Sequence, residues 1–189
     1  MLQLIRTRCI VVAAVSAYVV MSVAGQVRAE GTDDNSDTTT SSTTSTTSIP
    51  TDVAPEVPRK SGDGRRIVYS NKLQRVWVVN ADDDIVRTFL VSGRRGVPKP
   101  GSYRVFSQSV SSFSRELPGV TFRFMTRFAI GPKGGNIGFH ELPVRYGKPM
   151  QTVNQLGTFL GSGCLRSATA DAKFIYQWAR IGTSVVVVP

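Results

Sequence analysis

Residues 66–91 read RIVYSNKLQRVWVVNADDDIVRTFLV, and this stretch determines the fold class. Two runs of β-branched and aromatic residues, 67–69 and 75–79, flank a polar turn that contains Asn71. A third run of this kind, 85–91, follows a second polar turn that is rich in aspartate. Runs of this composition between turn-forming residues predict strands. The domain therefore begins with three consecutive β-strands rather than with helices.

The pattern of short strands continues to the end of the chain. A loop rich in glycine and proline, residues 92–101, separates the first strands from the next ones. One helix is predicted over residues 169–180, because its apolar residues line one face: Ala172, Ile175, Tyr176 and Ala179. The remaining predicted strands are 103–106, 120–130, 136–140 and 184–188. We therefore expect a mainly β fold over residues 64–189, a β-sandwich or open barrel with one helix packed on it.

The N-terminal third of the chain has the composition of an export signal followed by a linker. Residues 1–29 combine Arg6 and Arg8 with an apolar run of 16 residues and a small-residue cleavage site that ends at Ala29. We expect a signal peptide, with a retained N-terminal membrane anchor as the alternative. Either one exports the rest of the chain to the cell wall, the periplasm or the extracellular space. Residues 30–63 are rich in Ser, Thr and Pro, which predicts a disordered linker.

Positive charge is concentrated in the predicted domain. Residues 64–189 hold 18 basic and 6 acidic side chains, so this part carries a net charge of +12. Such a charge favours a polyanionic partner, for example an anionic cell-wall polymer. The export signal argues against nucleic acid as the partner, and the sequence has no aromatic–basic motif of a known nucleic-acid reader.

The chain has two cysteines and one histidine. Cys9 lies in the export segment, so the exported chain keeps a single thiol, Cys164, and cannot close an internal disulfide. A single thiol in a secreted protein indicates intermolecular pairing or a reactive group. Because an imidazole can take the proton of a thiol, Cys164 and His140 are candidates for nucleophile and base. The sequence offers no cluster of metal ligands, and we expect neither a metal nor another cofactor.

The segment GSGCLR, residues 161–166, surrounds the thiol. Its small residues allow a tight turn before the nucleophile, and amides in such a turn can stabilise an oxyanion. The amides expected to do so are those of Ser162, Gly163 and Cys164. Arg166 could bind a substrate carboxylate through two hydrogen bonds. The same features also have structural explanations: a lone cysteine is often a small buried apolar residue, and Arg166 could pair with Asp171.

Several segments, in this order, resemble the L,D-transpeptidase (YkuD-type) catalytic domain family. Residues 66–95 resemble its opening hairpin, the following strand and its substrate-side loop. PKPGSYRVFS at 98–107 resembles its proline–glycine turn and next strand, and IGFHELP at 137–143 matches the segment of its first histidine. LGTFLGSGCLRS at 156–167, followed by the helix and the last strand, matches its cysteine motif. The resemblance covers nearly the whole predicted domain and implies the fold of this family.

The resemblance also implies roles for individual residues. Cys164 would be the acylated nucleophile and His140 its base. One ring nitrogen of His140 would be held by the backbone carbonyl of Glu141 or, alternatively, by its carboxylate. Arg166 and Glu141 would belong to the substrate-binding part of the site.

Two positions depart from the family's motif. Gly161 stands where the family usually has Ser or Thr, and Ser162 stands where it usually has His. The second histidine of the motif is therefore absent. We expect Ser162 to contribute only its backbone amide, which every residue except proline supplies.

The reaction that the resemblance implies is acyl transfer between peptidoglycan stem peptides. Cys164 would attack the amide before the terminal D-Ala of a tetrapeptide stem and form a thioester. An amine of a neighbouring stem would then attack the thioester and give a 3→3 cross-link. Carbapenem inhibitors would acylate the same cysteine. The altered motif leaves two alternatives, a catalytically weak or inactive homologue that binds the cell wall, and a secreted cysteine hydrolase of peptidoglycan.

Overall fold

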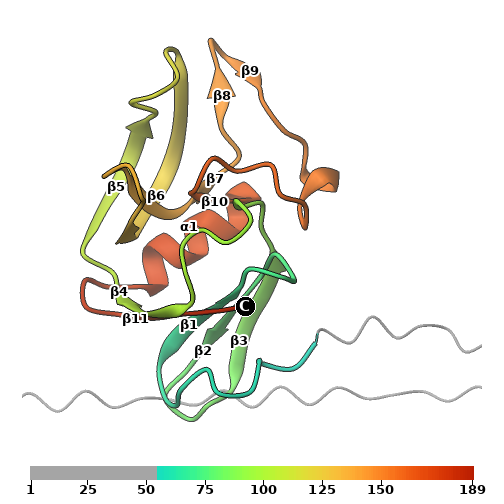
Figure 1. The fold of residues 1–189 in the computed structure, drawn as a ribbon, viewed down its shortest axis with the longest axis vertical. Helices are drawn as coiled ribbons and strands as arrows, with labels where there is room; N and C mark the ends of the chain where they lie inside the picture. The colour runs from blue at the N-terminus through green and yellow to red at the C-terminus, as the bar shows by residue number, and fades with distance from the viewer. Residues whose placement is uncertain (1–54) are drawn as a thin grey trace, which may run out of the picture. The chain divides into compact units, whose positions relative to one another are not determined.

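The computed structural model describes residues 55–189, which form a mainly β domain with one α-helix, α1 (Thr169–Trp178), and a short 3-10 helix, η1 (Val153–Gln155) (Figure 1). The strands are β1 (Arg66–Ser70), β2 (Arg75–Val79), β3 (Ile85–Leu90), β4 (Gly101–Arg104), β5 (Ser107–Phe113), β6 (Val120–Ile130), β7 (Asn136–Glu141), β8 (Val144–Arg145), β9 (Lys148–Pro149), β10 (Leu165–Ser167) and β11 (Ser184–Val188). The mainly β fold with one packed helix that the sequence predicted is confirmed.

The first sheet has five strands in the order β3-β2-β1-β11-β4. β1 lies at its centre, antiparallel to β2 and parallel to β11, and all five of its residues are buried. This burial explains why residues 67–69 form an uninterrupted apolar run, since a strand covered on both faces has no solvent-facing positions. Ile67 and Tyr69 face the main core, whereas Val68 packs with Trp77 and Val79 on the opposite face.

The second sheet has six strands, in the order β10-β7-β6-β8-β9 with β5 paired to β6. β6 is the longest strand, with 11 residues, and supports β5, β7 and β8. β5 was not predicted. Its sequence, SQSVSSF, is rich in serine and has no buried residue, so it lacks the apolar alternation that marks a strand in the sequence. Pairing along β6 rather than burial defines this strand.

Helix α1 packs on β6 and β7 (Figure 1). Ala172, Ile175 and Ala179 are buried on the predicted face, while Tyr176 is only partly buried. The helix ends at Trp178, two residues earlier than predicted. Its apolar face and the inner faces of both sheets form one hydrophobic core.

The folded part of the chain begins earlier than the predicted boundary at residue 64. Segment 55–63 packs on the outer face of the first sheet, where Val57 contacts the cluster of Val68, Trp77 and Val79. The Trp77 indole Nε1–H donates to the Pro55 carbonyl oxygen at 2.7 Å. The last nine residues of the predicted disordered linker are therefore part of the domain. The predicted signal peptide and residues 30–54 lie outside the described residues.

Within residues 55–189, no helix has the length and apolar character needed to cross a membrane.

We predict that a chain beginning at Gly64 is less stable than one beginning at Pro55. Loss of segment 55–63 exposes the sheet face that contains Trp77 and removes the Pro55 carbonyl oxygen that accepts from the indole N–H. We expect the free energy of unfolding to fall by about 1–3 kcal/mol, the usual range when a packed contact is removed. Urea denaturation of the two chains measures this difference, and equal midpoints would show that segment 55–63 contributes nothing to stability.

Candidate active site

The turn before Cys164 is fastened to the loop that follows β3. The Gly161 amide donates to the Gly93 carbonyl oxygen at 2.9 Å. On the other side of Cys164, the amide of Ser92 donates to the Arg166 carbonyl oxygen at 2.8 Å, and the amide of Arg166 returns a bond to Ser92 at 3.0 Å. The thiol therefore sits on a short segment that is held at both ends.

Close backbone approach explains the glycine at position 161. A Cβ atom there would lie 2.6 Å from the Cys164 carbonyl oxygen and 2.7 Å from that of Ser92. Both neighbours are backbone atoms, so neither can move aside cheaply. The Ser or Thr that the family usually has at this position does not fit this turn, which accounts physically for that departure from the motif.

A buried polar network supports the loop that holds the turn. The Gln74 side chain is fully buried, and its Oε1 accepts a hydrogen bond from the Gly93 amide. Its Nε2 donates to the Tyr69 hydroxyl at 2.7 Å and to the Asn71 carbonyl oxygen at 2.8 Å. Burial raises the pKa of Tyr69 to about 12, against the hydrogen bonds from Gln74 and Asn71, so the phenol stays protonated. A buried side chain thus holds the backbone amide of Gly93 in place.

His140 lies on β7 and is almost fully buried. Its Nδ1 is 2.6 Å from the Glu141 backbone carbonyl oxygen, the acceptor that the resemblance implied. A carbonyl oxygen can only accept, so Nδ1 carries the proton and Nε2 keeps its lone pair. The ring stacks on Phe122 with a centroid distance of 3.9 Å and an angle of 22°. This environment fixes the tautomer in which Nε2 can act as a base.

The electrostatic surroundings keep His140 neutral. Burial lowers its pKa to about 4, and the nearby charge of Arg166 acts in the same direction. The hydrogen bond to the Glu141 carbonyl opposes this shift but is the smaller effect. At neutral pH the imidazole is therefore uncharged.

The Cys164 thiol lies over the start of β7. Its Sγ is 3.4 Å from the Asn136 carbonyl oxygen, to which the thiol donates. Burial raises the pKa of Cys164, while a backbone hydrogen bond from Gly138 and the charges of Arg127 and Arg166 act in the opposite direction. The resting group is therefore a thiol rather than a thiolate.

Strand pairing places the segment of Cys164 beside the strand that carries His140. β10 runs parallel to β7, with Arg166 opposite His140. Cys164 lies directly before β10, and its Sγ contacts the carbonyl oxygen of Asn136, the first residue of β7. The described residues include no hydrogen bond between Cys164 and His140. The two residues thus lie on neighbouring segments, with the thiol bonded to Asn136.

The amides predicted for an oxyanion hole are those of Ser162, Gly163 and Cys164. Within residues 55–189, none of these three amides donates a hydrogen bond to another protein group. They follow directly after the fixed amide of Gly161. The three donors remain available beside the thiol.

Arg166 does not form the structural ion pair considered from the sequence. Asp171 instead pairs with Arg87 of β3, with 2.7 Å between the Arg87 Nη2 and the carboxylate. The Arg166 guanidinium makes one long contact, 3.3 Å from Nη1 to Gln151 Oε1. It is partly buried beside Cys164 and His140, and burial lowers its pKa. Its position suits an anionic group near the thiol.

The Glu141 carboxylate has partners within the fold, which do not support the predicted role in substrate binding. Arg123 contacts it through two nitrogens at 2.7 and 2.9 Å and through its backbone amide at 3.0 Å. The Thr169 hydroxyl adds a bond at 3.1 Å. Burial raises the pKa of Glu141, but the bonds from Arg123 and Thr169 outweigh it and lower the pKa overall. The carboxylate ties β6, β7 and the start of α1 together.

Several partners of the reactive groups were not predicted. Phe122 stacks on the base, Asn136 and Gly138 contact the thiol, and Arg127 places a charge near it. The sequence contained no signal for Phe122. Gly138, two residues before His140, was the one glycine in a strand interior, which often marks a close backbone approach.

We predict that Gly161→Ser, which restores a residue common in the family, damages this protein. The added side chain collides with two carbonyl oxygens, and overpacking of this kind costs about 1–3 kcal/mol. The free energy of unfolding, measured by urea denaturation, should fall by that amount. Gly135→Ser is the matched control, because a Cβ there meets no atom within 4 Å. Equal stability of Gly161→Ser and the wild type would show that the turn has room.

Stability should depend on pH through His140. Its pKa in the folded state, about 4, is lower than the ordinary value of 6.5, so the unfolded chain binds a proton first as pH falls. The free energy of unfolding should therefore fall between pH 6.5 and pH 4, by up to about 3 kcal/mol. Urea denaturation across this range, compared with His140→Gln, isolates the contribution. A difference between the two proteins that stays constant with pH would contradict the buried, neutral imidazole.

Comparison with known proteins identifies the family that this domain resembles. The family model for the YkuD L,D-transpeptidase catalytic domain matches residues 64–187. No curated protein sequence matches the chain significantly.

Three solved structures share the fold. The L,D-transpeptidase LdtMt1 in complex with imipenem is 18% identical, with a TM-score of 0.54 over 67% of this chain and 60% of that one. An L,D-transpeptidase from Stackebrandtia nassauensis is 20% identical, with a TM-score of 0.51 over 69% and 59%. One from Mycobacterium smegmatis is 15% identical, with a TM-score of 0.52 over 68% and 60%. This chain spans about three-fifths of the length of each. The match over residues 64–187 shows that the chain belongs to the YkuD-type L,D-transpeptidase catalytic domain family.

Proposed function

We propose that this protein is a peptidoglycan L,D-transpeptidase that forms 3→3 cross-links through a thioester on Cys164. The observation that supports the proposal is the pairing of β7 with β10, because the chain's one histidine lies on β7 and its one thiol outside the export segment directly precedes β10. The imidazole is neutral and its Nε2 is free to accept a proton. These are the requirements for a histidine that activates a thiol.

The first step is acylation of Cys164. As the sulfur attacks the carbonyl carbon before the terminal D-Ala, the thiol proton passes to Nε2 of His140. Since burial raises the pKa of the thiol and lowers that of the imidazole, the resting pair is uncharged and charge develops only during attack. His140 then gives the proton to the departing amine of D-Ala. The enzyme is left as a thioester with a neutral imidazole.

The unpaired amides of Ser162, Gly163 and Cys164 stabilise the oxyanion of the tetrahedral intermediate. Preorganised amide donors are often the largest contribution to acyl transfer, and removing one commonly costs about 10²–10³ in rate. Arg166 binds a carboxylate of the donor stem through charge-assisted hydrogen bonds. Because the guanidinium is partly buried, water screens this interaction less than it would at the surface. This division of roles leaves no requirement for a histidine at position 162.

In the second step, the side-chain amine of a neighbouring stem attacks the thioester. His140 accepts a proton from the attacking amine and returns it to the sulfur, so the thiol and the neutral imidazole are regenerated. The product contains a new amide between two stems. Transfer to water instead of the amine would make the protein a hydrolase, and the two outcomes differ in the product formed.

Export to the cell wall is part of the proposal. The basis is the charged, apolar and small-residue pattern of residues 1–29. The substrate is located outside the cytoplasm, so the enzyme must reach it there.

We predict that imipenem adds its mass to the protein in a one-to-one ratio, measured by intact-mass spectrometry. This inhibitor occurs in the complex of a related fold, LdtMt1. Cys164→Ala should abolish the adduct, because the nucleophile is gone. An unlabelled wild-type protein that still binds purified cell walls would be a binding homologue, not an enzyme.

The rates of acylation in variants should follow a definite order. His140→Ala should slow acylation about 10²–10⁴-fold, the usual effect of removing a positioned base. Ser162→Ala keeps the amide and should have little effect, whereas Ser162→Pro removes it and should be severe. If Ser162→Ala were as slow as His140→Ala, the hydroxyl would have taken over part of the proton transfer.

Incubating a tetrapeptide stem with and without an amine acceptor separates transpeptidase from hydrolase products.

A further inference from the structure

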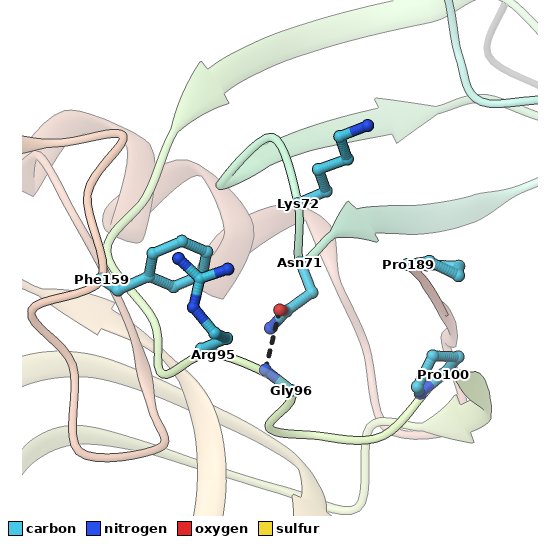
Figure 2. A pocket seen from close by; sticks show the side chains of 7 residues that line it. All are labelled: Asn71, Lys72, Arg95, Gly96, Pro100, Phe159 and Pro189. Atoms are coloured by element: carbon cyan, nitrogen blue, oxygen red, sulfur yellow. Dashed lines mark hydrogen bonds between the residues drawn. The ribbon is translucent and has the colours of Figure 1, made fainter.

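A pocket lies outside the candidate active site. It has a volume of about 460 Å³ and is built from the β1–β2 turn, the loop after β3 and the segment before Cys164. Figure 2 shows its lining residues: Asn71, Lys72, Arg95, Gly96, Pro100, Phe159 and Pro189. The proposed reaction uses none of these side chains. The volume falls within the range of small-ligand sites.

Positive charge surrounds this pocket without a matching acidic side chain. Lys72 and Arg95 line it, and the exposed Arg94 and Lys99 belong to the same loop. Within residues 55–189, none of these four forms an ion pair with an aspartate or glutamate within 4 Å. The acidic residues 82–84 follow the end of β2 that is opposite to the β1–β2 turn, and the β1–β2 turn is the part that lines the pocket. The unpaired charges make the pocket a site for an anion.

The pocket is preformed rather than a chance gathering of mobile side chains. The Arg95 guanidinium lies 4.2 Å from the centre of the Phe159 ring, and Figure 2 shows it stacked over that ring. Stacking leaves the in-plane N–H groups of an arginine free to bind an oxyanion.

Asn71 fixes the loop that carries Arg95. Its Oδ1 accepts from the Gly96 amide at 2.8 Å, shown in Figure 2, and its Nδ2 donates to the Arg94 carbonyl oxygen at 3.0 Å. The Val97 amide closes the turn on the Arg94 carbonyl oxygen at 3.1 Å. Arg95 therefore projects from the corner of a closed turn that is bonded to the β1–β2 turn.

We propose that this pocket binds an oxyanion, carboxylate or phosphate, carried by a saccharide chain of the cell wall. Arg95 donates a pair of hydrogen bonds to the oxyanion, and Lys72 supplies a second positive charge. Pro100, Pro189 and the Phe159 ring form apolar walls for the sugar to which the anion is attached. The site holds the enzyme on an anionic polymer, apart from the stem peptide that reacts. The choice of a cell-wall polymer rests on the proposed function, whereas binding of an oxyanion in the pocket does not depend on the chemistry of Cys164.

The pocket also shares segments with the nucleophile turn. Arg95 follows Gly93 by two residues, and Phe159 precedes Gly161 by two residues. The hydrogen bond between Gly93 and Gly161 joins these same segments. Polymer bound here would contact both of the segments that the hydrogen bond between Gly93 and Gly161 joins.

Binding to two defined probes tests the proposal, with the full chain and isothermal titration calorimetry at about 0.15 M ionic strength. One probe is an oligogalacturonate, which carries carboxylates, and the other is a phosphorylated oligosaccharide, which carries phosphates. The double variant Lys72→Gln/Arg95→Gln should weaken binding of the preferred probe about tenfold or more, the usual effect of losing charge-assisted hydrogen bonds. The preferred probe identifies which oxyanion the site takes.

A matched control separates this site from a general effect of net charge. Lys173→Gln/Arg180→Gln removes the same two charges from exposed positions at α1. It should change the affinity less than about twofold, because exposed charges are screened beyond roughly 8–10 Å. Phe159→Leu keeps every charge but removes the ring under Arg95, and it should weaken binding severalfold. Equal losses in the two double variants, or no binding of either probe by the wild type, would overturn the proposal.

Discussion

The hydrogen bond between the Gly161 amide and the Gly93 carbonyl oxygen is the constraint on which the site depends. It brings two glycines so close that a side chain at position 161 would collide with backbone oxygens. The position of Gly93 is fixed in turn by the buried side chain of Gln74. Gln74 also donates to the hydroxyl of Tyr69, which lies on the core strand β1. The Gln74 side chain and the Gly161–Gly93 hydrogen bond thus connect this strand to the segment that carries Cys164. A departure from the usual family motif is a consequence of this close packing, so it need not indicate lost activity.

Burial sets the protonation states of the two reactive groups in a complementary way. It disfavours the thiolate of Cys164 and the imidazolium of His140, so the neutral pair is the resting state. A thiolate–imidazolium pair would be more reactive toward any electrophile, whereas a neutral pair develops charge only where oxyanion donors can stabilise it. Arg166 and Arg127 add positive charge near the sulfur and moderate the cost of forming the thiolate. In the proposed mechanism, this arrangement favours reaction with a bound acyl group over nonspecific reaction of the thiol.

Much of the fold was predictable because its core strands carry their apolar pattern in the sequence. The runs that form β1, β2, β6 and β11 have buried positions, and burial is what the pattern reports. β5 and segment 55–63 escaped prediction because backbone pairing and a few contacts, rather than apolar periodicity, hold them. Cys164 and His140 stood out as rare residue types. Their partners Phe122 and Asn136 did not, since contacts between distant segments leave no local mark in the sequence.

The central claim is that His140 is a neutral base whose Nδ1 carries the proton. The chain has a single histidine, so one pair of ring ¹⁵N resonances reports on it without ambiguity. We predict that, between pH 8 and pH 5, the spectrum of the native protein shows the Nδ1–H tautomer without titration, since the pKa is about 4. An imidazole that titrates near 6.5, or that carries its proton on Nε2 at neutral pH, would contradict the account.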